Sequence, residues 1–425
     1  MIFAGFACAP VSFPLSIFPN PKENYTHVHD DPQIHVLIIE DKERFAFAFA
    51  GIVDPGDWDA ARKVLADAVG APVENVVFHT SHVLSTPHCF HGEYPNEAEK
   101  EKDLLLRKTI MDAISTAAQK AASAMEPVSV GVGYAYSQIN VNRVLESAEG
   151  YVEGTNEAGD TDHSVPLLCF KKESEELKAV VYTVNTAAGV LEHSKLSDGS
   201  RPVSGDIAAA SERKIKELLG IPAAYTLGAS GDQWQILRAM EDGLDVHGKQ
   251  YKVDRMEQGF DFVEILSNRL AQSVMHALPT VHYSDGELVP KLYTRTVTLP
   301  AHKELPPPVA RKIARSVTFE PAPDVRMEYH VFCMGDTAII CCKPEVCVAT
   351  LREIRDNSPF THTILLEFTN NHANYMVTKD LYEKCAPQSR KGYFSAGAAE
   401  IFAADAITFL HEIYISETDA PKHNI

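Results

Sequence analysis

The sequence repeats one ordered pattern three times: a strand, a short turn, a second strand, a helix and a third strand. The first copy spans strand-like runs at 35–39 and 44–50, a helical stretch at 58–69 and a strand at 75–78. The second copy spans 166–170, 179–184, 211–219 and 223–227, and the third spans 329–334, 337–342, 347–355 and 363–368. Units of one design bury their apolar faces together, so the pattern predicts an α/β fold built around one mixed system of sheets.

Polar side chains follow corresponding strands in all three copies. The second strands end at Asp54, Asn185 and Glu345, and His82, Asp232 and Tyr375 come just after the third strands. Loops beyond the carboxyl ends of strands in open α/β sheets converge, so we expect these residues to share one pocket. The alternative is that strand ends are polar in any α/β protein and these residues lie apart.

The loop after the strand at 75–78 is rich in histidine. It carries His79, His82 and His88, with Cys89 and His91 just beyond. Imidazoles gathered at the end of a strand are suited to a metal or catalytic centre. The alternative is a polar loop whose histidines are satisfied by hydrogen bonds.

Composition excludes some partners. The 425 residues include 39 basic and 58 acidic side chains, for a formal charge of −19, which repels nucleic acid and anionic membrane surfaces. No apolar run reaches the ~18 residues of a membrane helix, and no secretory leader is expected at the N-terminus. Eight cysteines without a CxxC pair predict reduced thiols. These features predict a cytoplasmic protein with a small-molecule substrate, and they leave homo-oligomer formation open.

The remaining segments are expected to complete a single domain over 1–425. Apolar periodicity predicts further helices at 101–125, 260–278 and 397–414, followed by a frayed tail at 416–425. The segment 278–323 is irregular and proline-rich, with one strand expected at 292–299. It is interpreted as a linker, a lid or a hairpin over the core.

Several short motifs together resemble the catalytic domain of the neutral (alkaline, non-lysosomal) ceramidases, which are zinc-dependent amidases. The motifs, in chain order, are Ser81-His82-Val83-Leu84-Ser85-Thr86-Pro87, Val141-Asn142-Arg143, Gly159-Asp160-Thr161-Asp162, Val203-Ser204-Gly205-Asp206, Gly228-Ala229-Ser230-Gly231-Asp232, Lys343-Pro344-Glu345, Asn374-Tyr375-Met376-Val377-Thr378 and Gly392-Tyr393. The resemblance implies a ceramidase-like α/β fold of a divergent member, with His82, Glu345 and Tyr375 as zinc ligands. It also implies that Arg143 and Tyr393 belong to the active site.

This sequence departs from the family pattern at three positions. Asn185 stands where the family has its second zinc histidine, Leu84 replaces another histidine, and Trp234 replaces a serine two residues after Asp232. Asn185 is a poor zinc ligand compared with imidazole. The other candidates for the missing ligand are His79, His88, His91 and His193, of which His193 lies only eight residues after Asn185.

The resemblance implies metal-assisted hydrolysis of an amide or related acyl bond. Zinc would polarise the acyl oxygen, Arg143 or Tyr393 would stabilise the oxyanion, and Asp232 would hold a water or orient a ligand. The alternatives to these catalytic roles are purely structural: a salt bridge for Arg143, a helix cap for Asp232 and a half-buried aromatic for Tyr393. Trp234 narrows the pocket, which favours a small soluble substrate over membrane ceramide.

Two other functions are compatible with the sequence. A ceramidase-like fold that has lost its metal would act as a binding or regulatory module, as the departures at Leu84, Asn185 and Trp234 suggest. A metal-dependent isomerase or lyase acting on a polar metabolite is the third possibility.

Overall fold

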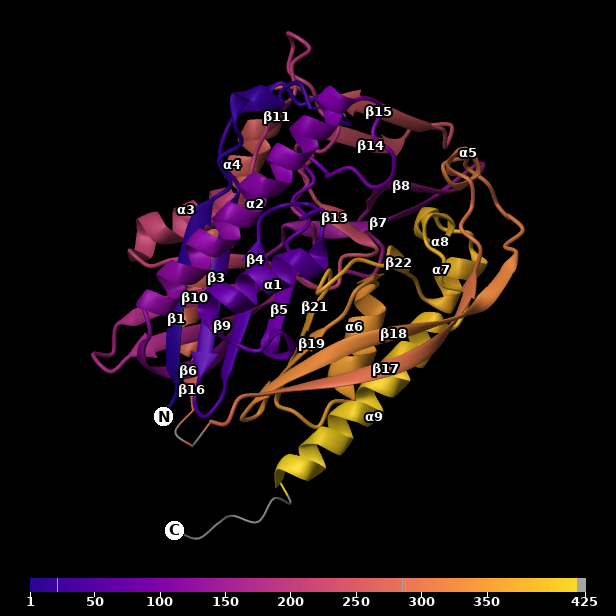
Figure 1. Ribbon diagram of the computed structural model, residues 1–425. Coiled ribbons are helices and arrows are strands. Elements are labelled where there is room, and N and C mark those ends of the chain that lie inside the picture. The colour runs from indigo at the N-terminus through magenta and orange to yellow at the C-terminus, as the bar shows by residue number, and fades with distance from the viewer. Residues whose placement is uncertain (21, 285, 287, 419–425) are drawn as a thin grey trace.

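The computed structural model describes residues 1–20, 22–284, 286 and 288–418. Two β-sheets pack face to face, and helices cover both outer surfaces, giving four layers (Figure 1). The chain is therefore a mixed α/β protein, as predicted.

The larger sheet has nine strands, in the order β12-β10-β9-β6-β1-β3-β4-β5, with β16 paired to β6. Their bounds are β1 Phe3–Pro10, β3 Gln33–Glu40, β4 Arg44–Ala50, β5 Val76–Thr80, β6 Glu126–Tyr136, β9 Ser164–Lys172, β10 Leu177–Val184, β12 Ala223–Leu227 and β16 His282–Tyr283. The smaller sheet has the order β17-β18-β19-β21, with bounds Lys291–His302, Pro321–Met334, Thr337–Cys341 and His362–Leu366.

The three predicted units are present, and each has the same topology. In each unit the first two strands are antiparallel, and the third runs parallel to the second through a crossover helix. The crossover helices are α1 Trp58–Val69, α3 Asp206–Leu219 and α6 Val348–Asp356. Two units lie in the larger sheet and the third forms most of the smaller one, so the common system consists of two facing sheets.

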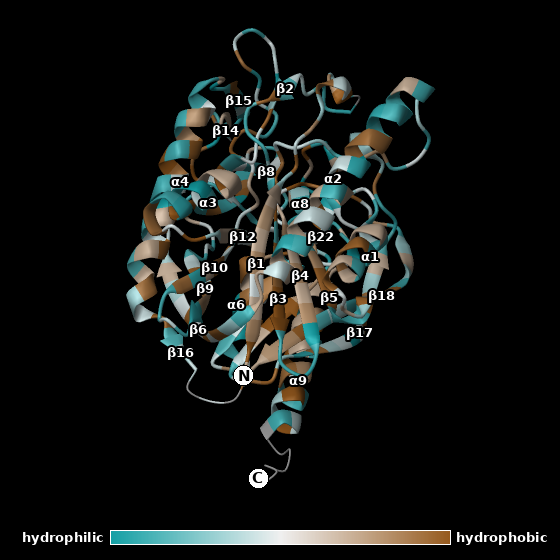
Figure 2. Ribbon diagram, turned by 60° about the vertical axis from the view of Figure 1, so that its left-hand side comes forward, coloured by the Kyte–Doolittle hydropathy of each residue, from teal (hydrophilic) through white to brown (hydrophobic). Residues whose placement is uncertain are grey.

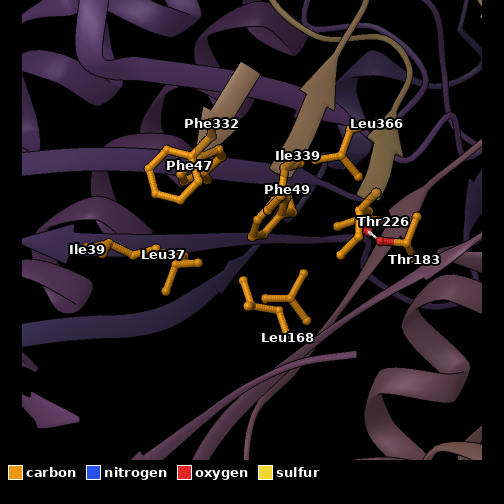
Figure 3. A pocket seen from close by; sticks show the side chains of 12 residues that line it. Leu37, Ile39, Phe47, Phe49, Leu168, Thr183, Thr226, Phe332, Ile339 and Leu366 are labelled. Atoms are coloured by element: carbon orange, nitrogen blue, oxygen red, sulfur yellow. Dashed lines mark hydrogen bonds between the residues drawn. The ribbon is translucent and has the colours of Figure 1, made fainter. Parts of the chain in front are cut away.

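Aromatic and branched side chains fill the space between the sheets. Phe332 of β18 packs edge-on against Phe45 and Phe47 of β4, with ring centroids 5.6 Å and 5.0 Å away. Figure 3 shows the small void there, about 20 Å³, which is lined by apolar side chains and by the bonded hydroxyls of Thr183 and Thr226. This volume is about that of a single water, so the void is a packing defect of the core.

Helices cover the outer faces of the sheets with their apolar sides. α1 and the long α2 (Glu97–Ser123) pack on the β1, β3 and β4 side, while α3 and α4 (Gln258–Ala277) pack on the β9 and β10 side. The smaller sheet is covered by α6 and α9 (Ala398–Thr418). Figure 2 shows the strands β1, β3, β4 and β5 as largely hydrophobic, whereas α2 and α4 alternate between hydrophobic and polar residues.

Two predictions about the chain ends and the proline-rich segment change. Within the segment 278–323, the long edge strand β17 is longer than the expected 292–299, and the last three residues begin β18. The described residues before β17 form only a 3-10 turn (Leu278–Thr280) and β16, and those between β17 and β18 are irregular apart from the short α5 (Pro307–Ala310). α9 continues through Thr418, so the expected frayed tail is wrong from 416 to 418, and its remainder, 419–425, lies outside the described residues.

The sequence patterns did not predict β1 and β6. Gly5 in β1 faces α2 so closely that a Cβ there would lie 2.1 Å from the carbonyl oxygen of Ala121. Gly131 and Gly133 in β6 similarly make room for Val281. Glycine weakens the strand signal in the sequence, and here it is required by close packing of neighbouring elements.

The smaller elements lie beyond the ends of the main strands. They include β7 Asn140–Ser147, β8 Gly150–Asn156, β13 Gln233–Gln235, β14 Met240–Leu244, β15 Gln250–Asp254, β20 Glu345–Val346, β22 Tyr375–Met376, α7 Lys379–Glu383 and α8 Pro387–Lys391, with the pair β2 His27–Val28 and β11 Pro202–Val203. Within the described residues, none of the helices is both long and apolar enough to cross a membrane.

Candidate functional site

His82 lies in the loop that follows β5. Its backbone adopts a left-handed conformation, with φ of 49°, and the loop is fixed by a bond from the Ser81 N–H to the Ala50 carbonyl. The imidazole lies against Phe368, with ring centroids 4.2 Å apart. Burial, reinforced by the nearby His88 and His372, holds the pKa of His82 well below its usual value. The ring is therefore neutral at pH 7 and has a lone pair available.

Glu345 and Tyr375 are neighbours in a short parallel ladder. They are direct partners in the pairing of β20 with β22, and the Glu345 N–H donates to the Asn374 carbonyl at 2.9 Å. β20 follows β19, and β22 follows β21, so the third unit delivers both side chains to the same end of its sheet. Burial raises the pKa of Glu345 to about 7 and raises that of Tyr375 above its usual value.

Arg143 reaches the same place from β7. Its guanidinium donates to the Gly231 carbonyl at 3.0 Å, lies 3.5 Å from a Glu345 carboxylate oxygen and sits 5.2 Å above the Tyr375 ring. Burial opposes its charge, but attraction to Tyr375 and to the carboxylates around it raises the pKa of Arg143 above its usual value. Arg143 is therefore a permanent, buried cation of the site.

These four residues share one cavity, which we call the inner cavity. It encloses about 150 Å³, and His82, Arg143, Glu345 and Tyr375 all line it. The volume corresponds to about five water molecules. The predicted convergence of an imidazole, a carboxylate and a phenol from distant segments is present in the structure.

A larger cavity, which we call the vestibule, adjoins the inner cavity. It encloses about 690 Å³ and shares four wall residues with the inner cavity: Glu153, His193, Lys252 and Lys391. One side is formed by the segment after β17, including Leu305, Pro307 and Arg311. The irregular part of the proline-rich segment is thus placed at the mouth of the inner cavity.

Two of the predicted residues do not line the inner cavity because their polar groups are used elsewhere. The Asn185 side chain accepts from the Ala229 N–H at 3.0 Å, which links the ends of β10 and β12. Asp232 accepts from Val348 N–H at 3.1 Å, the first helical residue of α6, and from the Asn142 amide. Burial raises the pKa of Asp232. The structure gives both residues positions that support the fold around the cavity.

Tyr393 and His193 take different positions. Tyr393 is a half-buried aromatic packed on Phe394 at 4.5 Å, and it lines neither the inner cavity nor the vestibule. His193 lines both cavities and lies 3.4 Å from a Glu192 carboxylate oxygen, with 70% of its side chain exposed. His193 is therefore at the boundary between inner cavity and vestibule.

His79 proves to be a structural histidine. Its Nδ1 bonds to the Glu367 carbonyl at 2.7 Å and its Nε2 accepts from the Leu227 N–H at 3.1 Å, which ties β5 to the ends of β21 and β12. Burial lowers the pKa of His79 to about 4. For His79, the alternative of a histidine satisfied by hydrogen bonds is therefore correct.

The buried neutral ring of His79 predicts a pH-dependent stability. A histidine in the unfolded chain has a pKa of about 6.5. Between that pH and about pH 4, His79 is therefore protonated in the unfolded state and neutral in the folded state. The unfolding free energy should therefore fall by about 1.4 kcal/mol per pH unit through this window because of His79. We expect urea unfolding to show that the difference in unfolding free energy between the wild type and His79→Gln shrinks by roughly 2 kcal/mol between pH 6.5 and 5. The exposed control His276→Gln should leave the difference from wild type constant.

A third cavity lies on the other side of His82. It encloses about 350 Å³ and is lined by His82 together with Asp54, His88, His91 and His372. His91 contacts an Asp54 carboxylate oxygen at 2.7 Å, and His88 lies 3.0 Å from a Glu23 carboxylate oxygen. Two of these histidines are therefore engaged by carboxylates, and His82 forms the wall between this cavity and the inner one.

The sequence analysis missed six charged residues of the inner cavity: Glu153, Glu192, Arg238, Asp242, Lys252 and Lys391. Glu153 lies on β8 beside Arg143, and Lys391 donates to it at 2.9 Å. Although burial opposes it, Lys391 and Arg143 lower the pKa of Glu153 to about 2. β8 and α8 carry none of the repeated pattern, so the sequence offers no signal for Glu153 and Lys391.

The predicted metal ligands fit a zinc ion in part. His82 Nδ1 is closed off from solvent and has no hydrogen-bond partner among the described residues, and it shares the cavity with Glu345 and Tyr375. In the described part of the chain, no three His, Cys, Asp or Glu side chains come together as a metal site, so a metal ion held by His82 and Glu345 would need the phenol of Tyr375 as its third donor. One imidazole, one carboxylate and one phenol meet the minimum of three protein ligands that leaves an open position.

Comparison with solved structures finds the same architecture in ceramidases. The structure of neutral ceramidase from Pseudomonas aeruginosa matches with a TM-score of 0.70 and 14% identity, over 97% of this chain and 75% of that chain. A ceramidase complexed with C2 matches with a TM-score of 0.69 and 14% identity, over 100% of this chain and 76% of that one. No family model and no curated protein matches the sequence. The four-layer α/β protein described above therefore has a ceramidase-like fold.

Proposed function

We propose that this protein is a hydrolase of ceramidase type that cleaves an amide or related acyl bond in a small polar substrate. The observation that carries the proposal is the meeting of His82, Glu345 and Tyr375 with Arg143 in one inner cavity. The ceramidase-like fold supports the same reaction class.

His82, Glu345 and Tyr375 are the residues that would hold a zinc ion. Zinc bound there would supply Lewis-acid polarisation of the acyl oxygen and a more acidic water. The neutral imidazole of His82 needs no deprotonation to act as a ligand. Cytoplasmic location and zinc dependence are parts of this proposal.

Arg143 would stabilise the negative charge that develops on the acyl oxygen. Its guanidinium stays charged, and its Nε–H has no acceptor among the described residues. Glu153 and Glu345 fix its orientation from two sides, at 3.9 Å and 3.5 Å. A preorganised hydrogen-bond donor directed at the developing negative charge contributes about 10²–10³-fold to a rate.

The size of the inner cavity supports a small substrate. About 150 Å³ lies below the roughly 300–1,000 Å³ of a site for drug-sized ligands. Trp234 lines the cavity and is stacked with Arg238, whose guanidinium lies 4.1 Å from its ring centroid. Both side chains occupy space that a long acyl chain would need.

The proposal is tested by metal analysis and turnover of protein purified without added metal. We expect about one equivalent of zinc and hydrolysis of short-chain amides from a library, with loss of both after chelation. Less than a tenth of an equivalent, with no activity restored by added zinc, would contradict the metal-dependent hydrolase.

A binding module without metal is the second candidate. The contacts of Arg143 favour it, because a buried cation already lies beside Glu345 and Tyr375 and balances the carboxylate. Ligand binding with no metal and no product would support this function. Product identification would separate hydrolysis from an isomerase or lyase reaction.

A further inference from the structure

The vestibule differs in charge from the protein as a whole. The chain carries a formal charge of −19, yet the vestibule wall contains Lys252, Arg311, Arg390 and Lys391 against only Glu153 and Glu304. A cleft lined by one sign of charge concentrates ligands of the opposite sign. An anion is therefore drawn to this entrance in spite of the acidic surface elsewhere.

Arg238 and Trp234 form a preorganised wall of the inner cavity. The Arg238 guanidinium lies over the Trp234 ring, 4.1 Å from its centroid, donates to Glu192 at 2.7 Å and lies 3.8 Å from an Asp242 carboxylate oxygen. The two side chains are 9% and 6% exposed. A guanidinium held in this way loses little conformational freedom when it binds a ligand.

Two N–H groups of this wall lack acceptors. Neither Nε of Arg238 nor Nε1 of Trp234 has a hydrogen-bond partner among the described residues, although both atoms are buried. Buried donors of this kind are nearly always paired in proteins, and an unpaired one is a cost that a ligand acceptor removes. The wall therefore favours a ligand with a charged acceptor.

We propose that the inner cavity recognises a carboxylate on its substrate through Arg238 and Trp234, so that the preferred substrates are short N-acyl amino acids. This inference rests on the proposed amide hydrolysis for the reaction and on the cavity wall for the ligand. The carboxylate belongs to the amine half of the substrate, while the acyl carbonyl lies toward Arg143. A volume of about 150 Å³ suits a short acyl group joined to a glycine-sized amine.

Matched probes separate recognition from catalysis. Turnover is compared for N-acetylglycine and its uncharged counterpart N-acetylglycinamide. Binding is measured by calorimetry with the methyl-ketone isosteres 4-oxopentanoate and 4-oxopentanamide, which contain no amide at the reacting position. We expect the carboxylate to be preferred about 10- to 100-fold in both assays, the range for a hydrogen-bonded ion.

Variants test which residues create the preference. Arg238→Gln should remove the preference for the carboxylate probes over their uncharged counterparts, and Trp234→Phe, which keeps a ring beside Arg238, should reduce that preference about 3- to 10-fold. Lys312→Gln removes an exposed positive charge that lines none of the three cavities described above and is the matched control. Arg238→Gln removes the arginine that donates to Glu192, so this variant could fail to fold. In that case the carboxylate preference of Trp234→Phe tests the proposal.

The outcomes distinguish this inference from the proposed function. Selective binding of 4-oxopentanoate without hydrolysis of either amide would retain carboxylate recognition and reject the hydrolase. Hydrolysis of both amides at equal efficiency would retain the hydrolase and reject carboxylate recognition. A preference that persists in both variants, or tighter binding of inorganic phosphate than of 4-oxopentanoate, would overturn the proposal.

Discussion

His82→Ala is expected to lower zinc content and hydrolysis together, each by at least about 100-fold in affinity or kcat/KM. Residues that only support a metal ligand already contribute roughly 10- to 100-fold, so loss of the one buried imidazole among the described residues that line the inner cavity should exceed that range. Among the described residues that line the inner cavity, the other histidine is the exposed His193 at its mouth. Metal analysis and amide turnover on the same preparation measure both effects.

His91→Ala is the matched control for this experiment. His91 follows the same strand, is 59% exposed, contacts Asp54 and lines only the third cavity. A surface change of this kind usually alters stability by less than about 0.5 kcal/mol. Equal zinc content and equal activity in His82→Ala and the wild type would show that the inner cavity does not depend on this imidazole, and the metal-free binding module would then be the better account.

Phe332→Ala is expected to destabilise the protein by about 3–5 kcal/mol, the usual cost of deleting a buried phenylalanine. Phe332 is 1% exposed, and its ring on the smaller sheet contacts Phe45 and Phe47 of the larger one. Figure 3 shows Phe332 beside Phe47. The residues around it are held in two separate sheets, so they cannot easily close the gap. The neighbouring void would grow, and the packing of the two sheets would loosen.

Urea unfolding at constant pH measures this cost. Phe332→Leu, which keeps most of the apolar volume, should cost clearly less than the alanine variant. Phe319, which packs on His302 and Tyr382 away from the sheet interface, provides a matched aromatic position for Phe319→Ala. An alanine variant at 332 no less stable than that at 319 would contradict the role assigned to the interface between sheets.

The alternation of strands and helix in the three units could be predicted because it is local. Val76 to Phe78, Ala179 to Val184 and Ile364 to Leu366 are runs of branched or apolar residues that end in polar loops, and each lies in a strand of the structure. The α1 bounds, Trp58–Val69, agree with the sequence prediction because Asp57 caps one end and Gly70 ends the other. Strands with weak local signals, such as β1 with Gly5, could not be recognised in this way.

The candidate site could be predicted only where a residue closes a strand of the repeated pattern. His82, Glu345 and Tyr375 do so, and Arg143 came from the resemblance of its motif. Asn185 and Asp232 close strands as well, yet their side chains bond to Ala229 and Val348 and do not line the inner cavity. Position at a strand end specifies a region of the fold, and it does not specify the direction of a side chain.

By itself, the sequence determined the three units, the order of their strands and the end of the sheets at which polar residues gather. Hydrophobic periodicity and turn chemistry act over a few residues, and this is enough to define such elements. Only the tertiary structure decided that the third unit forms a separate sheet, that β20 pairs with β22, and that Arg238 lies on Trp234 beside the inner cavity. These arrangements depend on contacts between segments far apart in the chain, whose energies come from packing and burial that no local pattern contains.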